Sequence, residues 1–174
     1  MTGKPVVYLV ACSAPPVREL AEPLSLLHEA GWSACVILTP IAASWIDIAG
    51  LEAETAVPVR VHPRLPHEQD PLPKADAVLA APLTFNSLNK IAGGISDTLA
   101  VSLVNELLGT DLPIVAAPCI KSLLRTHPVY STSVQLLTSC GVHLLDPDTI
   151  TSRGLDGLAA FDWSTVVTEF LQAV

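Results

Sequence analysis

Polar side chains that could bind a phosphorylated ligand follow three apolar runs of this chain. Ser13 comes after the first run, Thr39 after the second, and Thr84–Ser87 after a later one. If these runs are parallel strands, their carboxyl ends meet at one edge of an open α/β sheet, where such sheets bind ligands. Hydroxyl groups and the free amides at a helix start are suited to a phosphate. The pattern therefore favours a phosphate site built from strand ends.

The same side chains also fit purely structural roles. Ser13 and Thr39 fit as capping hydroxyls, Thr84 or Ser87 as the N-cap of a helix, and Asn86 as an ordinary turn residue. The sequence contains no Gly-x-Gly-x-x-Gly pattern, which argues against a dinucleotide with a pyrophosphate. A single terminal phosphate needs less, namely one helix start and a few hydroxyls. We therefore expect a mononucleotide rather than a dinucleotide.

The cysteines do not form a metal-binding or disulfide pattern. Four are scattered along the chain without any Cys-x-x-Cys pair, and three lie in apolar, strand-like contexts. This spacing predicts reduced thiols in the core and no metal site. The four residues are Cys12, Cys35, Cys119 and Cys140.

Composition limits the classes of partner. Of 174 residues, 50% are apolar and only 15% are charged, and the net charge is −8. We expect no broad nucleic-acid contact, because an acidic chain cannot neutralise a run of phosphates. A surface this poor in charge favours burial between subunits, since interface centres are depleted in charge. No apolar stretch has bilayer length and no signal-peptide pattern is present, so we expect a cytoplasmic protein without membrane contact.

Alternating strands and helices must position these side chains. Continuous apolar runs are typical of parallel strands covered on both faces. Six are predicted: Pro5–Ala11, Ala34–Leu38, Val57–Val61, Ala77–Ala81, Pro113–Ala117 and Val142–Leu145. With right-handed crossovers they give a Rossmann-like, doubly wound parallel six-stranded α/β sheet, and residues 1–174 form a single domain.

Helical spacing fills most of the connections. Two long helices are predicted with an interruption at or next to a proline: Val17–Ala30 with a kink or break at Pro23, and Lys121–Cys140 with a break at His127. Uninterrupted helices are predicted from Thr39 to about Ala49 and over Trp163–Ala173. Two more are predicted to begin near Ser87 and at Asp97, with Asp97 as the N-cap of the second. Two segments lack periodicity and are predicted to be loops. One is Pro147–Asp162, and the other is His62–Lys74, which holds four prolines. A loop as long as His62–Lys74 is usually functional or mobile.

The segment Ala75–Leu99 carries a resemblance to a known family. Pro82–Ser87 is similar to the Pro-Ala-Ser-Ala-Asn-Thr signature of the homo-oligomeric flavin-containing cysteine decarboxylase superfamily, and Asn89–Ala92 and Gly94–Asp97 follow in family order. The resemblance extends over roughly Pro5–Pro147. It implies a Rossmann-like flavoprotein domain that binds flavin mononucleotide (FMN) at a subunit interface. It also implies a homo-oligomer, either a trimer or a dodecamer of trimers.

The resemblance further implies which residues hold FMN. Members hold the FMN phosphate with residues such as Ser13 and Thr39, and Asn86 is expected to contact the ligand. Phe85 replaces a small alanine, so its ring packs either near the isoalloxazine or against a neighbouring subunit. The implied cofactor-binding residues are Ser13, Thr39, Pro82, Thr84, Phe85, Asn86 and Ser96.

A second, weaker resemblance concerns the substrate. The superfamily carries Pro-x-Met-Asn-x-x-Met-Trp after its fifth strand, and Pro118–Arg125 occupies that place here. In the decarboxylases this motif binds the substrate carboxylate and peptide end, which implies Cys119, Ile120 and Lys121 as substrate-binding residues. Lys121 replaces the family asparagine and could hold a carboxylate as a point charge. The alternative is an ordinary solvated lysine in the first turn of a helix.

The resemblance also implies a catalytic histidine ahead of the fourth strand, and His67 is the candidate. Histidine is the side chain best suited to accept a proton near neutral pH, and the neighbours Glu68 and Asp70 could raise its basicity. The alternatives are that His67 is an exposed loop residue, or that His62 takes the role. The remaining histidines, His28, His127 and His143, lie in helix or strand contexts and are interpreted as structural.

These features imply an FMN-dependent oxidative decarboxylase. Members that reduce their enethiol intermediate carry a late cysteine in a glycine-rich flap, and no cysteine follows Cys140 here. We therefore expect the reaction to stop at an aminoenethiol, formed from the C-terminal cysteine of a precursor peptide in modified-peptide biosynthesis. The alternatives are a phosphopantothenoylcysteine decarboxylase-like enzyme, and an FMN-binding redox or partner module without decarboxylase activity.

Overall fold

The six predicted strands form one parallel sheet. The computed structural model describes residues 3–69 and 72–174, and the strand order is β3-β2-β1-β4-β5-β6. All five neighbouring pairs are parallel. This is the order of a doubly wound, Rossmann-like sheet, as predicted. The strands are β1 (Val6–Ala11), β2 (Ser33–Leu38), β3 (Val59–Arg60), β4 (Ala77–Leu83), β5 (Ile114–Pro118) and β6 (His143–Leu144).

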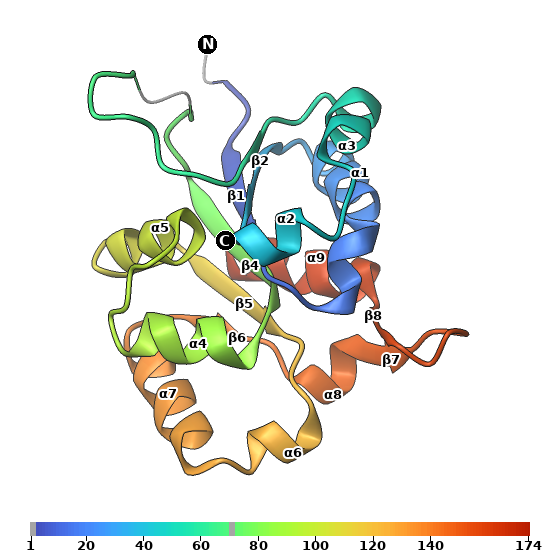
Figure 1. Cartoon of the computed structure of the whole chain (residues 1–174), viewed down its shortest axis with the longest axis vertical. Coiled ribbons are helices and arrows are strands. Elements are labelled where there is room, and N and C mark those ends of the chain that lie inside the picture. Colours follow the sequence, from blue (N-terminus) through green and yellow to red (C-terminus); the bar gives the residue numbers. More distant parts are fainter. Residues whose placement is uncertain (1–2, 70–71) are drawn as a thin grey trace.

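Helices cover both faces of the sheet (Figure 1). The 3-10 turn η1 (Pro15–Glu19) and the helices α1 (Ala21–Glu29), α3 (Ile48–Thr55) and α9 (Trp163–Ala173) lie on one face, and α4 (Phe85–Ala92), α5 (Leu99–Leu108) and α7 (Pro128–Ser139) on the other. Alternate side chains of each strand enter the two cores. In β1, for example, Leu9 is buried on the α1 side and Val10 on the α4 side.

Two predicted helices are divided, one at His127 as predicted and the other three residues before the expected position, Pro23. The expected Val17–Ala30 helix divides at Leu20, which leaves Pro23 in the first turn of α1, where a missing amide is tolerated. The expected Lys121–Cys140 helix divides into α6 (Ser122–Arg125) and α7, with His127 as the N-cap of α7.

Three of the predicted elements were wrong. The single helix from Thr39 to Ala49 is instead α2 (Pro40–Ala43) and α3, because the Asp47 carboxylate accepts the Gly50 amide hydrogen at 3.1 Å and starts a new helix. Thr98, not Asp97, caps α5, because Asp97 is paired with Lys90.

The third wrong prediction is the loop Pro147–Asp162. It contains α8 (Pro147–Ile150) and an antiparallel hairpin, β7 (Thr151–Arg153) and β8 (Ala159–Phe161). Gly157 in the hairpin turn adopts a φ of +76°, which glycine takes without a steric cost. Phe161 and Trp163 pack edge to face, so the end of the hairpin joins the core below α9.

Candidate functional site

The carboxyl ends of four neighbouring strands are tied together in a row. The Thr39 amide donates to the Ala11 carbonyl at 3.1 Å, the Cys12 amide to the Pro82 carbonyl at 2.9 Å, and the Cys119 amide to the Leu83 carbonyl at 2.8 Å. These backbone hydrogen bonds continue the pairing of β2, β1, β4 and β5 at the carboxyl ends of the strands. Both motifs of the sequence therefore lie at one edge of the sheet.

The topology opens a ligand site at this edge. The segment after β1 passes to α1 on one face, whereas the segment after β4 passes to α4 on the opposite face (Figure 1). The two segments diverge between β1 and β4, and a place where neighbouring strands send their connections to opposite faces of the sheet is called a switch point. Open α/β sheets bind ligands at such a point. Ser13 and Thr84 stand on its two sides.

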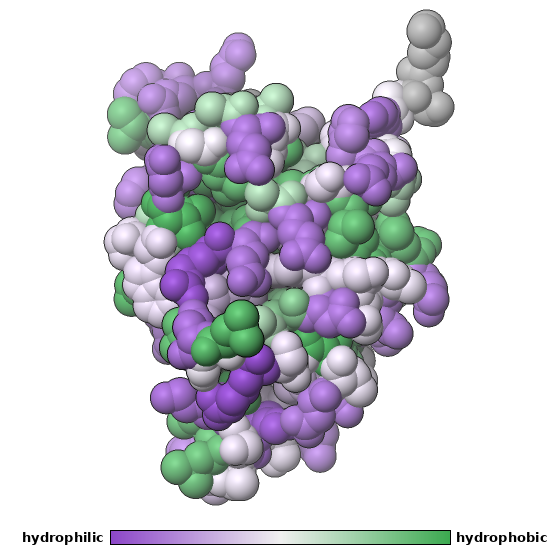
Figure 2. All heavy atoms as spheres, turned by 90° about the vertical axis from the view of Figure 1, so that its right-hand side faces the viewer, coloured by the Kyte–Doolittle hydropathy of each residue, from purple (hydrophilic) through white to green (hydrophobic). Residues whose placement is uncertain are grey.

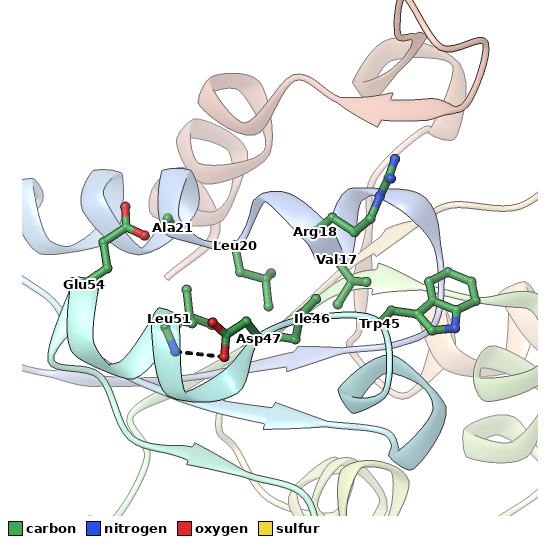
Figure 3. Close-up of a pocket in the computed structure, with 10 residues that line it drawn as sticks. Val17, Arg18, Leu20, Ala21, Trp45, Ile46, Asp47, Leu51 and Glu54 are labelled. Carbon is green, nitrogen blue, oxygen red and sulfur yellow. Dashed lines mark hydrogen bonds between the residues drawn. The ribbon is translucent and has the colours of Figure 1, made fainter.

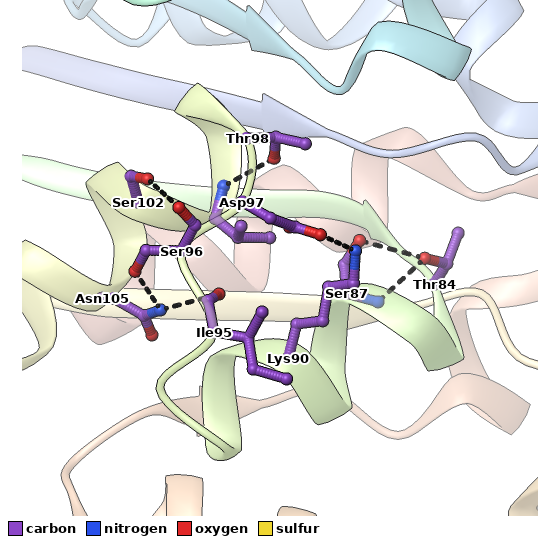
Figure 4. Close-up of polar contacts among 10 residues, drawn as sticks. Thr84, Ser87, Lys90, Ile95, Ser96, Asp97, Thr98, Ser102 and Asn105 are labelled. Atoms are coloured by element: carbon purple, nitrogen blue, oxygen red, sulfur yellow. Dashed lines mark hydrogen bonds and ion pairs between the residues drawn. The ribbon is translucent and has the colours of Figure 1, made fainter.

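Thr84 begins α4 as its N-cap. Its Oγ1 accepts the Ser87 amide hydrogen at 3.3 Å and donates to the Ser87 hydroxyl at 3.2 Å (Figure 4). Ser87 is buried, whereas Asn86 is exposed. The cap uses the third amide of the helix and leaves those of Phe85 and Asn86 without intrahelical acceptors. The turn therefore presents two amides and the Asn86 side chain to a ligand, while the Thr84 hydroxyl is engaged by Ser87.

The two other predicted phosphate residues differ from each other. The Thr39 hydroxyl caps α2 by accepting the Ala42 amide hydrogen at 3.4 Å, and Thr39 is buried. Ser13 lies just before η1, whose N-cap is Ala14. Among the described residues Ser13 has no side-chain hydrogen-bond partner, and it is half-buried. Its hydroxyl is thus free to bind an anion at the switch point.

Cys12 is a site residue that sequence reasoning missed. Its thiol is buried beside the β4–α4 turn, and burial raises its pKa, although hydrogen bonds with Ser87 and Thr84 partly offset this. Cys12 therefore stays a neutral thiol and links the end of β1 to the start of α4. Its place directly before Ser13 was the signal that could have found it.

Ser96, predicted to bind the cofactor, belongs to a hydrogen-bonded loop (Figure 4). The Asn105 amide donates to the Ser96 hydroxyl at 2.9 Å and to the Ile95 carbonyl at 3.1 Å, and the Ser102 hydroxyl donates to the Ser96 carbonyl at 3.2 Å. Lys90 and Asp97 form an ion pair across the same loop. These contacts hold the exposed Ser96 side chain near α4 and give it a structural role.

The second motif surrounds the end of β5. Ile120 is buried, Cys119 is half-buried and Lys121 is exposed. Burial raises the pKa of the Cys119 thiol to about 11. Lys121 precedes α6 without a capping side-chain bond, and among the described residues it has no ion-pair partner.

Arg125, in place of the family tryptophan, anchors the end of α6. It binds Asp148 in α8 through two hydrogen bonds of 3.0 and 2.7 Å. These bonds lower the pKa of the Asp148 carboxyl, and the same pairing raises the pKa of Arg125. Arg125 is therefore already occupied by a carboxylate, and Lys121 is the cation of this motif that remains available.

Phe85 of the first motif contacts His127, which lies two residues after the second motif. Their rings pack edge to face with centroids 5.7 Å apart. His127 is exposed and caps α7, with its Nδ1 accepting the Val129 amide hydrogen at 3.2 Å. His127 thus has the structural role that the sequence predicted, as the cap of α7. The sequence did not predict that it also lies beside the site.

His67 is not brought to this edge within one chain. It lies exposed in the loop between β3 and β4, and β4 starts at the opposite edge of the sheet (Figure 1). The seven residues of β4 span about 20 Å between this loop and Thr84. His62 lies in the same loop, and Asp70 lies outside the described residues.

One cavity lies beside the switch point but contains none of the predicted site residues. It has a volume of about 400 Å³ and lies between the η1–α1 segment and the start of α3 (Figure 3). Arg18, Trp45 and Asp47 line it, and Asp47 is engaged as the N-cap of α3.

A comparison with protein families identifies the family of the chain. The family model described as Flavoprotein matches residues 24–174, which is most of the chain. The chain belongs to the flavoprotein family. The predicted resemblance to the homo-oligomeric flavin-containing cysteine decarboxylase superfamily is thereby confirmed.

Sequence relatives of this flavoprotein include decarboxylases of cysteine-containing substrates. The coenzyme A biosynthesis bifunctional protein of Thermococcus kodakarensis is 36% identical over 74 residues, which are 42% of this chain and 18% of that protein. The chain covers only 18% to 36% of the length of the first curated relatives that it matches.

Solved structures share the fold of this flavoprotein over nearly its whole length. A mutant PPC decarboxylase in complex with pantothenoylaminoethenethiol superposes with a TM-score of 0.78 and 21% identity, covering 97% of both chains. The FMN-dependent cysteine decarboxylase TvaF from thioviridamide biosynthesis has a TM-score of 0.70 and 22% identity, covering 84% of this chain and 93% of that one. At these identities the likeness establishes the fold.

The described part of the flavoprotein offers neither a metal cluster nor a membrane-spanning helix. Within residues 3–69 and 72–174, no group of three or more His, Cys, Asp or Glu side chains could hold a metal ion. None of the helices in that described part combines the length and apolarity needed to cross a membrane. All four cysteines are free thiols.

Proposed function

We propose that this flavoprotein binds FMN at the carboxyl edge of its sheet and oxidatively decarboxylates a C-terminal peptidyl cysteine. The single observation that carries the proposal is the juxtaposition of the two motifs. The backbone bonds from Cys12 to Pro82 and from Cys119 to Leu83 set the signature turn and the substrate motif side by side. A flavin at the first turn would therefore lie next to a substrate at the second.

The residues present fit a flavin mononucleotide. The free Ser13 hydroxyl and the Thr39 hydroxyl supply donors for a phosphate or a ribityl chain, and the first-turn amides of α4, oriented by the Thr84 cap, supply two more. Pro82 sets the turn, and the exposed Asn86 amide is assigned to the ring edge. When bound, FMN supplies an acceptor for two electrons from the substrate cysteine, after which the carboxylate leaves as carbon dioxide.

The substrate carboxylate is assigned to Lys121. Its ammonium group is exposed at the edge beside Cys119 and Ile120, whereas Arg125 is paired with Asp148. Cys119 is not a nucleophile at neutral pH, because its pKa of about 11 keeps it a thiol. Cys119 and Ile120 therefore contribute an apolar wall, and Lys121 contributes the charge.

One feature supports a product that is not reduced. The segment after Cys140 forms α8 and the β7–β8 hairpin and contains no cysteine that could reduce an enethiol. We assign an aminoenethiol as the product, and a precursor peptide of a ribosomally made modified peptide as the substrate. The phosphopantothenoylcysteine decarboxylase alternative is favoured by the sequence relatives.

We assign a homo-oligomer to the active form. Large apolar side chains are exposed on several elements, including Ile41 (61%), Leu123 (80%) and Leu155 (112%). Figure 2 shows apolar residues in several separate patches on the face that carries α1 and α3. If His67 is the base, it must come from a neighbouring subunit, because β4 separates it from the signature turn of its own chain. A trimer or a dodecamer of trimers would provide this.

The test is a comparison of substrates with the purified, FMN-loaded protein. A short peptide ending in cysteine should lose carbon dioxide and two hydrogens by mass spectrometry, whereas the same peptide ending in serine should not react. Turnover of 4′-phosphopantothenoylcysteine alone would select the coenzyme A-type alternative. A protein that retains FMN but reacts with neither would select the non-catalytic module.

A further inference from the structure

His127 lies two residues after the second motif, Pro118–Arg125, and contacts the first motif. Its ring packs edge to face against Phe85, with centroids 5.7 Å apart and an interplanar angle of 73°. Phe85 is the first residue of α4, directly after the Thr84 cap. His127 therefore belongs to the same edge as the signature turn, although it lies beyond β5 in the sequence.

The start of α7 fixes the state of this imidazole. Nδ1 accepts the Val129 amide hydrogen at 3.2 Å, so Nδ1 must carry a lone pair rather than a proton. The proton of the neutral ring is then on Nε2. Among the described residues Nε2 has no acceptor, and the side chain is exposed. The ring consequently offers one N–H donor beside Phe85.

Lys121 and His127 flank the same short helix. Lys121 precedes α6, the four-residue helix Ser122–Arg125, and His127 follows it. The amides of Leu124 and His127 donate to the carbonyls of Lys121 and Leu124 at 2.9 and 3.2 Å, which fixes the backbone between the two side chains. The Asp148 carboxylate at the end of α6 is already paired with Arg125. The pair thus consists of an ammonium group and a neutral N–H donor.

We propose that His127 is a substrate-binding residue whose Nε2–H donates to the substrate carboxylate that Lys121 also holds. The inference rests on the proposed function for the nature of the substrate. A neutral donor and a cation together fix both oxygens of a carboxylate, which a single flexible lysine does not. The edge-to-face contact with Phe85 sets the ring plane, so the donor direction is defined before the substrate binds.

The decisive variant keeps the helix cap and removes the donor. Aspartate is among the best N-cap residues, so His127→Asp retains the bond to the Val129 amide while placing a negative charge beside the ligand. His127→Ala removes both the cap and the donor. His28→Gln is the control, because His28 is exposed on α1 away from both motifs.

Binding is measured on the FMN-loaded protein with a peptide that ends in serine, because a C-terminal serine cannot be oxidised as cysteine can. Two forms of this peptide are compared, one with a free C-terminal carboxylate (the acid) and one with a C-terminal amide. Wild type and His28→Gln should bind the acid about tenfold more tightly than the amide, and His127→Asp should lose that preference with unchanged FMN content. A wild-type preference in His127→Asp overturns the proposal, as does equal or absent binding of the two peptides by wild type.

A second readout is independent of both FMN and turnover. Two-bond nitrogen–proton NMR spectra of the histidine rings should show the Nε2–H tautomer for His127, and the Nδ1–H tautomer would overturn the proposal. The proposed function can fail separately. If wild type binds the acid peptide selectively but does not decarboxylate the cysteine peptide, the oxidative activity is wrong and the carboxylate subsite stands.

Discussion

The two turns at the carboxyl edge of the sheet are built differently. The β4–α4 turn is held by short-range contacts, with Thr84 capping the helix, Ser87 buried beneath it and the Cys12 thiol alongside. The β5–α7 connection is mostly exposed and is fixed at a distance, through the ion pair of Arg125 with Asp148. The first turn offers backbone amides and hydroxyls, and the second offers long charged side chains.

This difference separates two properties of the site. Backbone donors recognise a phosphate with little dependence on individual side chains, so the first turn suits a constant cofactor. Exposed charged side chains can be exchanged without disturbing the fold, so the second turn suits a substrate that varies between relatives. We therefore expect substitutions in the first turn to change stability and FMN retention together, and substitution of the exposed Lys121 in the second to change substrate binding without changing FMN retention.

The largest expected effect is on the rate at which the thiols of the two turns are alkylated, compared with cysteines in the unfolded chain. With a pKa of about 11, Cys119 is almost wholly protonated at pH 8, so its alkylation should be a few hundredfold slower than in the urea-denatured chain, where a thiol has a pKa of about 8.5. Burial also protects Cys12. The measurement is mass-spectrometric iodoacetamide labelling against time, with Cys119→Ser to assign the peptide.

The protection of Cys119 should weaken as the pH rises toward 11, because the thiolate fraction then increases. Rapid labelling of Cys119 at pH 8 in the folded protein would mean that the second turn is open at the end of β5. The second turn would then not combine a buried apolar wall, formed by Cys119 and Ile120, with the exposed charge of Lys121.

The next effect separates substrate binding from cofactor binding. Lys121→Gln should weaken binding of a peptide with a free C-terminal carboxylate by about tenfold to a hundredfold, the range for a hydrogen bond to a charged group. FMN content should be unchanged, and Lys121→Arg should restore most of the affinity. Loss of FMN from Lys121→Gln would show that the two turns do not act separately.

A smaller effect tests the first turn. Thr84→Val keeps the shape of the side chain but removes the cap on Ser87, which should cost about 1 kcal/mol of unfolding free energy and lower the melting temperature by about 2–4 °C. FMN retention should fall as well, because the cap orients the first-turn amides. Thr168→Val is the control for loss of a threonine hydroxyl, because Thr168 is exposed on α9, outside both turns, and its side chain has no hydrogen-bond partner among the described residues. Unchanged FMN retention in Thr84→Val would separate the cap from cofactor binding.

The sheet and the first turn could be predicted because their signals are local. Continuous apolar runs gave six strands, and the signature Pro82–Ser87 placed the start of α4 within a few residues. The capping roles of Thr39 and Thr84 were among the alternatives, and the structure shows both. Parallel pairing then brings strand ends together without further information.

The misses depend on interactions that a linear pattern does not carry. Asp97 has the sequence of an N-cap, but the Lys90 ammonium group competes for its carboxylate and Thr98 takes the cap. The contact between Phe85 and His127 joins residues from two separate elements, so no spacing rule could find it. The role of His67 remains a prediction, because it depends on the arrangement of a second subunit.

The smallest expected effect concerns the ion pair that fixes the second turn. Hydrogen bonds from Arg125 lower the pKa of Asp148 below its usual 3.8. A carboxyl group whose pKa is depressed in the folded state stabilises the fold above its unfolded pKa, and this contribution is lost as the pH falls through the folded value. Wild type should therefore melt at a slightly higher temperature than Asp148→Asn at pH 7, and the difference should shrink as the pH falls below 3.8.

The effect is small because the Asp148 carboxylate is 70% exposed and screened by solvent. Asp111→Asn is the matched control, since Asp111 is exposed and has no ion-pair partner among the described residues. The measurement is the melting temperature of the three proteins between pH 7 and pH 3. A difference that does not shrink as the pH falls below 3.8 would assign the anchoring of α6 to packing around Arg125 rather than to charge, and the second turn would then resemble the first.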